Sequence, residues 1–131
     1  MVTQCPRCAG DRFTADVPTE LAPYAESTTL ACCRRCLAVE PGEPADTDLD
    51  SSFETIILRF PTGTKGIAVL VLLDKLDSLA LNRREIESLV EFLEANGVDL
   101  FLTLDRLLAA PAVDPYLDLA RRRDQLEAVI E

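Results

Sequence analysis

Hydrophobic residues recur at helical spacing through the second part of the chain, from residue 53 to residue 131. The first such segment follows a capping box formed by Ser51 and Glu54, and it ends before Pro61. Its apolar residues fall at positions i, i+3, i+4 and i+7: Phe53, Ile56, Ile57 and Phe60. This pattern predicts a short helix over residues 53–60.

A second helix is predicted over residues 65–81. Its run from Ile67 to Leu73 is apolar on almost every face, which is typical of a helix buried at the centre of a domain. A β-strand is the competing interpretation, because Val and Ile also favour strands. The apolar pattern is too long for an ordinary strand, so we favour the helix.

A third helix is predicted after Asn82 and Glu85, which form a second capping box. The pair Asn96-Gly97 suits the left-handed residue that ends many helices. Its apolar stripe consists of Ile86, Leu89, Val90 and Leu93.

Two more helices complete the predicted bundle. Asp99 is the expected N-cap of the fourth helix, which Pro111 ends, and Asp114 followed by Pro115 is the preferred order at a helix start. Their apolar residues are Leu100, Phe101, Leu104, Leu107 and Leu108, then Tyr116, Leu119, Leu126 and Val129 or Ile130. Because the connections are short, we expect four to five short helices packed as a roughly antiparallel bundle.

The first 40 residues instead contain three short β-favouring segments, at residues 12–15, 28–32 and 37–39. Residues 41–52 are acidic and carry Pro and Gly without periodicity, which indicates a linker. The sequence therefore predicts an α+β protein: a small β unit over residues 1–40, an acidic linker over 41–52 and an all-α bundle over 53–131.

Charge and the absence of histidine narrow the range of functions. The 131 residues carry 13 Lys and Arg against 23 Asp and Glu, which gives a formal net charge of −10, and there is no His. The chain therefore has no Ser-His or Cys-His nucleophilic pair and no usual neutral-pH proton carrier. The segment Gly63-Thr64-Lys65-Gly66 is only half of a phosphate-binding loop. We expect that the protein is not an enzyme.

All five cysteines lie in the first 40 residues, and four of them form two Cys-x-x-Cys pairs separated by 24 residues. Two thiolates three residues apart can fold over one metal ion in a tight turn, and zinc takes four such ligands in a tetrahedron. The N-terminus shows no signal peptide pattern, so we expect a reducing cytoplasm, where paired thiols bind metal. We predict one structural Zn²⁺ per chain, bound by Cys5, Cys8, Cys33 and Cys36.

The fifth cysteine, Cys32, leaves alternatives open. It could replace Cys33 as the partner of Cys36, although the tighter spacing of the Cys33 pair suits the turn better. Alternation along a strand would place Cys32 on the face opposite Cys33, as a small packing residue. A redox role for the adjacent Cys32 and Cys33 is the remaining alternative. The second pair also lacks a following glycine, since Leu37 comes directly after Cys36, so it fits the turn less well than Cys8-Ala9-Gly10.

The order of turn, strand, loop, strand, turn and strand resembles the zinc-ribbon family over about 40 of the 131 positions. Only Lys65 and Lys75 are lysines, and this acidic, lysine-poor composition resembles proteins of extremely halophilic archaea. An acidic mesophilic protein is the alternative. The whole chain resembles small uncharacterised zinc-ribbon proteins of halophilic archaea that have a helical C-terminal region, and this resemblance implies no activity.

Three kinds of function follow from these features. The first is a protein-interaction or adaptor module built on the zinc ribbon. The second is nucleic-acid binding, for example in transcription, through Arg7, Arg12, Arg34 and Arg35. These arginines would also offset the charge of a zinc tetrathiolate. A thiol redox switch is the third.

The expected partners and location follow from the helical part. Its apolar second helix needs neighbours on all sides, so we expect a homodimer through residues 53–131 unless the ribbon covers that helix. The most apolar stretch, Ile67 to Leu81, carries Asp74, Lys75 and Asp77 near its middle, so we expect a cytoplasmic protein without a membrane segment. Because the helical core needs no metal, we also expect loss of a zinc ligand to unfold residues 1–40 and spare the helices.

Overall fold

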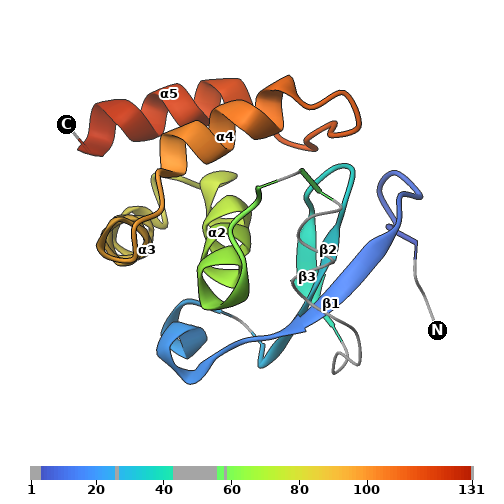
Figure 1. The fold of residues 1–131 in the computed structure, drawn as a ribbon, viewed down its shortest axis with the longest axis horizontal. Coiled ribbons are helices and arrows are strands. Elements are labelled where there is room, and N and C mark those ends of the chain that lie inside the picture. Colours follow the sequence, from blue (N-terminus) through green and yellow to red (C-terminus); the bar gives the residue numbers. More distant parts are fainter. Residues whose placement is uncertain (1–3, 26, 43–55, 58, 131) are drawn as a thin grey trace.

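The computed structural model describes residues 4–25, 27–42, 56–57 and 59–130. Its order of elements is a small antiparallel sheet followed by helices (Figure 1), which confirms the α+β class. The elements are β1 (Arg12–Asp16), the 3-10 helix η1 (Thr19–Tyr24), β2 (Thr29–Cys33), β3 (Val39–Pro41), α2 (Gly63–Leu76), α3 (Arg83–Ala95), α4 (Leu100–Ala109) and α5 (Leu119–Ile130).

Strands β1 and β2 overlap the β-favouring segments at residues 12–15 and 28–32, and β2 is the central strand of the sheet. The third segment, predicted at residues 37–39, is displaced: β3 begins only at Val39, because Leu37 and Ala38 belong to the preceding turn. Phe13 pairs with Cys32, and Ala15 pairs with Leu30, in the antiparallel register of β1 and β2. All four residues are buried in the cluster that also contains the apolar residues of α2. One face of the sheet is therefore part of the main hydrophobic core.

Helix α2 is the centre of the fold, as its apolar run predicts. In Figure 1 it stands between the sheet and α3, with α4 and α5 across one end. Nine of its 14 residues are buried, from Gly66 to Leu73 and at Leu76. The core of one chain already covers this helix on both sides, so the reason for expecting a homodimer falls away, while the oligomeric state itself stays a prediction.

The core joins the two parts of the sequence into one unit. Leu21 and Leu30 from residues 1–40 lie in the same buried cluster as Leu70, Ile86 and Leu104 from the helical part. Most of the proposed linker, residues 43–52, lies outside the described residues. Because the core is shared, we now expect loss of a metal ligand to weaken the helices as well.

The second helix ends at Leu76 and not at residue 81. The amide of Asn82 donates hydrogen bonds to the carbonyl oxygens of Lys75 and Ser78, at 3.3 and 3.2 Å. The side chain thus satisfies carbonyl groups at the end of α2 and makes no capping bond to α3, so the predicted capping box of Asn82 and Glu85 is wrong. Leu81, predicted to be helical, is 88% exposed in the turn.

The structure confirms the predicted end of α3 at Asn96-Gly97 and the predicted N-cap of α4 at Asp99. Gly97 has a φ of +78°, and the N–H of Val98 donates to the carbonyl oxygen of Leu93 at 2.9 Å. Asp99 then caps α4, because its Oδ1 accepts the N–H of Leu102 at 3.1 Å.

The starts of the first and last predicted helices differ from expectation. Helix α5 begins at Leu119, where Oδ1 of Asp118 accepts the N–H of Arg121 at 3.2 Å, so Asp114 is not its cap. Much of the segment predicted as a helix over residues 53–60 lies outside the described residues. Within it, Ile56 lies in a turn and Arg59 has a φ of +80°, which is not helical.

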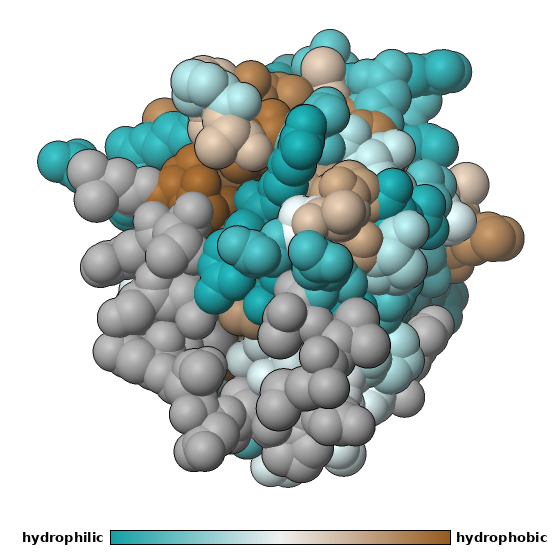
Figure 2. All heavy atoms as spheres, turned by 90° about the vertical axis from the view of Figure 1, so that its right-hand side faces the viewer, coloured by the Kyte–Doolittle hydropathy of each residue, from teal (hydrophilic) through white to brown (hydrophobic). Residues whose placement is uncertain are grey.

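Among the described residues, no helix is long and apolar enough to cross a membrane. Figure 2 views the molecule from the side of the sheet, where hydrophilic side chains cover much of the described surface and hydrophobic ones gather near the top.

A substitution in the ribbon should reveal the shared core. Leu21, in η1, is fully buried. We expect Leu21→Ala to lower the free energy of unfolding by about 2–5 kcal/mol, and the helical circular dichroism signal to be lost at a lower denaturant concentration. The matched control is Leu81→Ala, which should change stability by less than about 0.5 kcal/mol because the residue is exposed. An unchanged helical transition in Leu21→Ala would contradict a shared core.

Candidate metal centre

Four thiol groups meet at one end of the sheet, where two turns face each other. The Sγ atoms of Cys5, Cys8, Cys33 and Cys36 all lie within 4.8 Å of one another. Across the two turns, Cys5 Sγ is 3.6 Å from Cys36 Sγ, and Cys8 Sγ is 3.5 Å from Cys33 Sγ. The structure thus brings together the four residues that the sequence spacing selects, and they could hold a metal ion.

The first turn, over residues 5–10, precedes β1. The N–H of Cys5 donates to the carbonyl oxygen of Gly10 at 2.7 Å, and the N–H of Ala9 donates to that of Cys5 at 2.8 Å. The N–H of Arg7 points at Cys5 Sγ from 3.4 Å. Ala9 adopts a left-handed φ of +61°, so the chain reverses there without a glycine.

The second turn, over residues 33–38, repeats these bonds between β2 and β3. The N–H of Cys33 donates to the carbonyl oxygen of Ala38 at 3.0 Å, and that of Leu37 donates to Cys33 at 3.1 Å. The N–H groups of Arg35 and Cys36 both lie 3.4 Å from Cys33 Sγ. The interpretation that this half fits the turn less well is therefore wrong.

Leu37 replaces the missing glycine because its side chain has a place in the core. It adopts a φ of +65°, at the position that Ala9 occupies in the first turn. A left-handed conformation costs such a residue about 1–2 kcal/mol. Its side chain is fully buried in the main hydrophobic cluster, which offsets this cost.

Gly10 is needed for space. A Cβ atom at this position would lie 3.1 Å from Cys33 Sγ, 3.2 Å from Cys8 Sγ and 3.1 Å from the Cβ of Arg35. Any larger residue would therefore push on two of the four sulfur atoms.

The spacing of the sulfur atoms suits a tetrahedral metal ion. With Zn–S bonds of about 2.3 Å, a regular tetrahedron has sulfur atoms about 3.8 Å apart. The two distances between the turns, 3.5 and 3.6 Å, lie close to that edge length. Cys5, Cys33 and Cys36 are buried and Cys8 is partly buried, so a bound ion would be largely shielded from water.

The thiols differ in how readily they lose a proton. Burial alone would raise the pKa of Cys5, but hydrogen bonds from the N–H groups of Arg7 and Cys8 bring it down to about 7. Burial raises the pKa values of Cys33 and Cys36, and the neighbouring thiols raise that of Cys36 further. A cation that binds four thiolates must therefore displace protons from the deeper sulfur atoms.

Cys32 lies on the opposite face of β2, as strand alternation predicts. It is fully buried in the main core and is not part of the four-sulfur cluster. Burial also strongly raises the pKa of its thiol. Cys32 is therefore a packing residue, and a reactive thiolate role does not fit this environment.

The loop between α4 and α5 closes over the second turn, which sequence reasoning missed. The N–H of Asp114 donates to the carbonyl oxygen of Arg35 at 2.6 Å, and the N–H of Tyr116 donates to that of Cys36 at 3.0 Å. The Tyr116 side chain packs against the cysteine cluster. Pro111 and Pro115 indicate an extended loop, but a single sequence does not tell which surface the loop contacts.

The ring of Tyr116 also contacts an arginine of the first turn. The Arg7 guanidinium carbon lies 4.7 Å from the centre of the Tyr116 ring, a cation–π distance. Burial, together with the carboxylates of Asp77 and Asp74, raises the pKa of Tyr116 to about 12, so the phenol stays neutral. The helical part and the first turn thus meet at the metal centre.

Two other arginines of the N-terminal part make contacts within residues 4–42. Arg12 pairs with Glu40 at 3.2 Å. Arg34 donates to the carbonyl oxygen of Arg12 at 3.2 Å, and its guanidinium lies 5.1 Å from the centre of the Phe13 ring. Arg35 is exposed on the second turn.

Comparison with known proteins identifies a family but no activity. Neither a curated protein nor a solved structure matches the chain. Residues 4–130 match the sequence model of a family of unknown function (DUF6276), so the chain belongs to that family.

Proposed function

We propose that the protein is a structural zinc protein whose N-terminal turns form a zinc ribbon, and that it acts as a protein-interaction or adaptor module. The observation that carries this proposal is the set of four sulfur atoms within 4.8 Å, held by two turns with matching hydrogen bonds. A site with four thiolates is typical of zinc, and an S₄ site also suits iron, so the metal content is the first test.

A structural role fits the closed form of this site. Four protein ligands leave no open coordination position for water or substrate. Binding of structural zinc contributes about 10–16 kcal/mol to the folding of small zinc domains. Here that energy would hold Cys5 and Cys8, which precede β1, against Cys33, the last residue of β2, and Cys36 in the turn that follows.

The adaptor role is inferred from the segments that a bound metal ion would hold together. The zinc would fix the turns, the sheet and the loop between α4 and α5 as one rigid surface. A partner would be a second protein, or a second copy of the chain, bound through residues 53–131.

Nucleic-acid binding through the ribbon is the alternative. Three of its four arginines contact groups of the ribbon or Tyr116, and the chain has a net charge of −10, which weighs against it. Only Arg35, exposed on the second turn, favours it.

The metal assignment predicts one zinc per chain. Elemental analysis of the purified protein should give this ratio, and Cys33→Ser should lose the metal because one tetrahedral ligand is gone. Cys32→Ala is the matched control, since the neighbouring thiol lies on the other face of β2 and should leave the zinc content unchanged. Absence of zinc, or loss of it in Cys32→Ala alone, would refute the assignment.

The loop between α4 and α5 should slow the exchange of a bound metal ion, because Tyr116 packs against the cysteine cluster. Tyr116→Ala removes the ring that covers the cysteine cluster and should speed zinc transfer to a chelator about tenfold. Tyr116→Phe keeps the ring and its contact with Arg7, so it should behave as the native protein. Equal rates in all three proteins would show that the loop does not shield the metal.

A gel-shift measurement separates the adaptor from a nucleic-acid binder. The zinc-loaded protein should give no shift of DNA or RNA at the working salt concentration, and neither should the Arg34→Ala/Arg35→Ala double variant. A shift that the double variant abolishes would replace the adaptor proposal with nucleic-acid binding.

A further inference from the structure

A cavity of about 380 Å³ lies where the starts of two helices meet, away from the cysteines. Thr62 and Lys65, from the start of α2, line one side, and Asp99 and Thr103, from the start of α4, line another. Arg59 and Arg106 also line the cavity, so that, with Lys65, three cationic side chains face it. These three are gathered in one place on a chain with a net charge of −10.

The three cations have no acidic partner within the described part of the chain. Every ion pair found there involves other basic residues, for example Lys75 with Glu85. Asp105, next to Arg106 in sequence, pairs with Arg123 at 2.9 Å. Among the described residues that line the cavity, Asp99 is the one carboxylate, and its Oδ1 accepts the N–H of Leu102.

Three cations and one carboxylate leave the described lining with a net positive charge, and an anion between the cations would compensate it. The positive ends of the α2 and α4 dipoles lie at the same place and add to the attraction. Guanidinium groups match the oxygen geometry of phosphate particularly well. Charge and geometry therefore select a phosphate-type oxyanion.

An apolar cavity adjoins this one and shares its two arginines. It measures about 280 Å³ and is lined by Arg59, Arg106, Ile57, Ala109 and Ala110. An anion held by the arginines would place its organic substituent against these aliphatic side chains. We propose that the two cavities together bind a small phosphate monoester with an apolar substituent, a site independent of the zinc.

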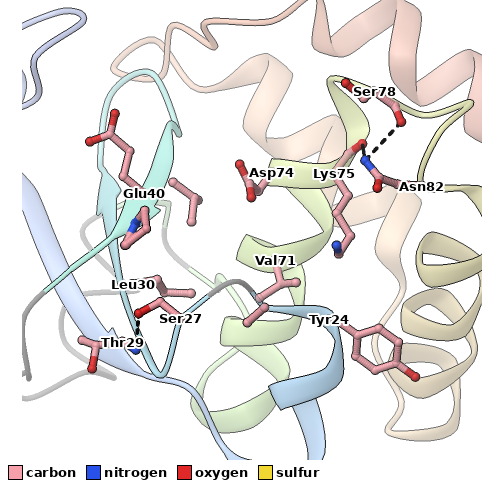
Figure 3. A pocket seen from close by; sticks show the side chains of 13 residues that line it. Tyr24, Ser27, Thr29, Leu30, Glu40, Val71, Asp74, Lys75, Ser78 and Asn82 are labelled. Carbon is pink, nitrogen blue, oxygen red and sulfur yellow. Dashed lines mark hydrogen bonds between the residues drawn. The ribbon is translucent and has the colours of Figure 1, made fainter.

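The cavity between the sheet and α2 differs in the charges that it presents (Figure 3). It has about 280 Å³ and is lined by two acidic residues, Glu40 and Asp74, and one basic residue, Lys75. The ammonium group of Lys75 lies 3.5 Å from Glu85. This mixture of signs, with its cation already paired, does not select an anion.

Calorimetric titration of the zinc-loaded full chain tests the proposal, with phenyl phosphate and inorganic phosphate as probes at constant ionic strength. We expect saturable one-to-one binding of both, with phenyl phosphate the tighter. Lys65→Gln and Arg106→Gln should each weaken both probes about tenfold, because each removes a charge-assisted hydrogen bond. Ala109→Leu should fill the apolar cavity and weaken phenyl phosphate alone.

The matched control is Arg84→Gln, which removes the same charge from an exposed position on α3 outside both cavities. It should leave both affinities unchanged. Equal weakening in Arg84→Gln and Lys65→Gln would mean general electrostatic attraction and would overturn the site. No saturable binding of either probe, or equal affinity for the two, would overturn the organic phosphate proposal.

Discussion

The fold depends on bringing four thiol groups to within 4.8 Å of one another. Thiolates at this separation repel strongly, and burial makes their deprotonation still less favourable, as the raised pKa values of Cys33 and Cys36 reflect. A divalent cation reverses this balance by halving the total charge of the cluster. As four thiolates, the cysteines would therefore need a cation at their centre, whereas as protonated thiols they carry no charge to compensate.

The alternation of side chains along β2 links this centre to the hydrophobic core. Cys33 belongs to the cysteine cluster, whereas Cys32, one residue before it, packs in the main core with α2. Leu37 makes the same connection from the second turn, since its left-handed backbone shapes the turn while its side chain lies in the core. Movement at the metal centre would therefore be transmitted to α2.

Charged residues are distributed in two ways on this acidic chain. Most arginines with described contacts lie against carboxylates, carbonyl oxygens or aromatic rings, as Arg12, Arg34 and Arg123 do. Arg59, before α2, and Arg106, in the last turn of α4, form no ion pair among the described residues, so unpaired basic side chains gather beside one cavity of an acidic chain. Such local concentrations of charge determine which ligands approach, whatever the net charge is.

The sequence by itself determined the grouping of the four cysteines, the first two strands, the buried character of α2 and the caps at Gly97 and Asp99. Each of these depends on spacing or on contacts within a few residues. Only the tertiary structure decided that the helices share a core with the sheet and that Tyr116 packs against the cysteine cluster. It also decided that Leu37 can adopt a left-handed backbone conformation, and that the Asn82 side chain binds carbonyl groups at the end of α2 instead of capping the start of α3. These features depend on groups distant in the chain or on competition between neighbouring partners, which local propensity does not encode.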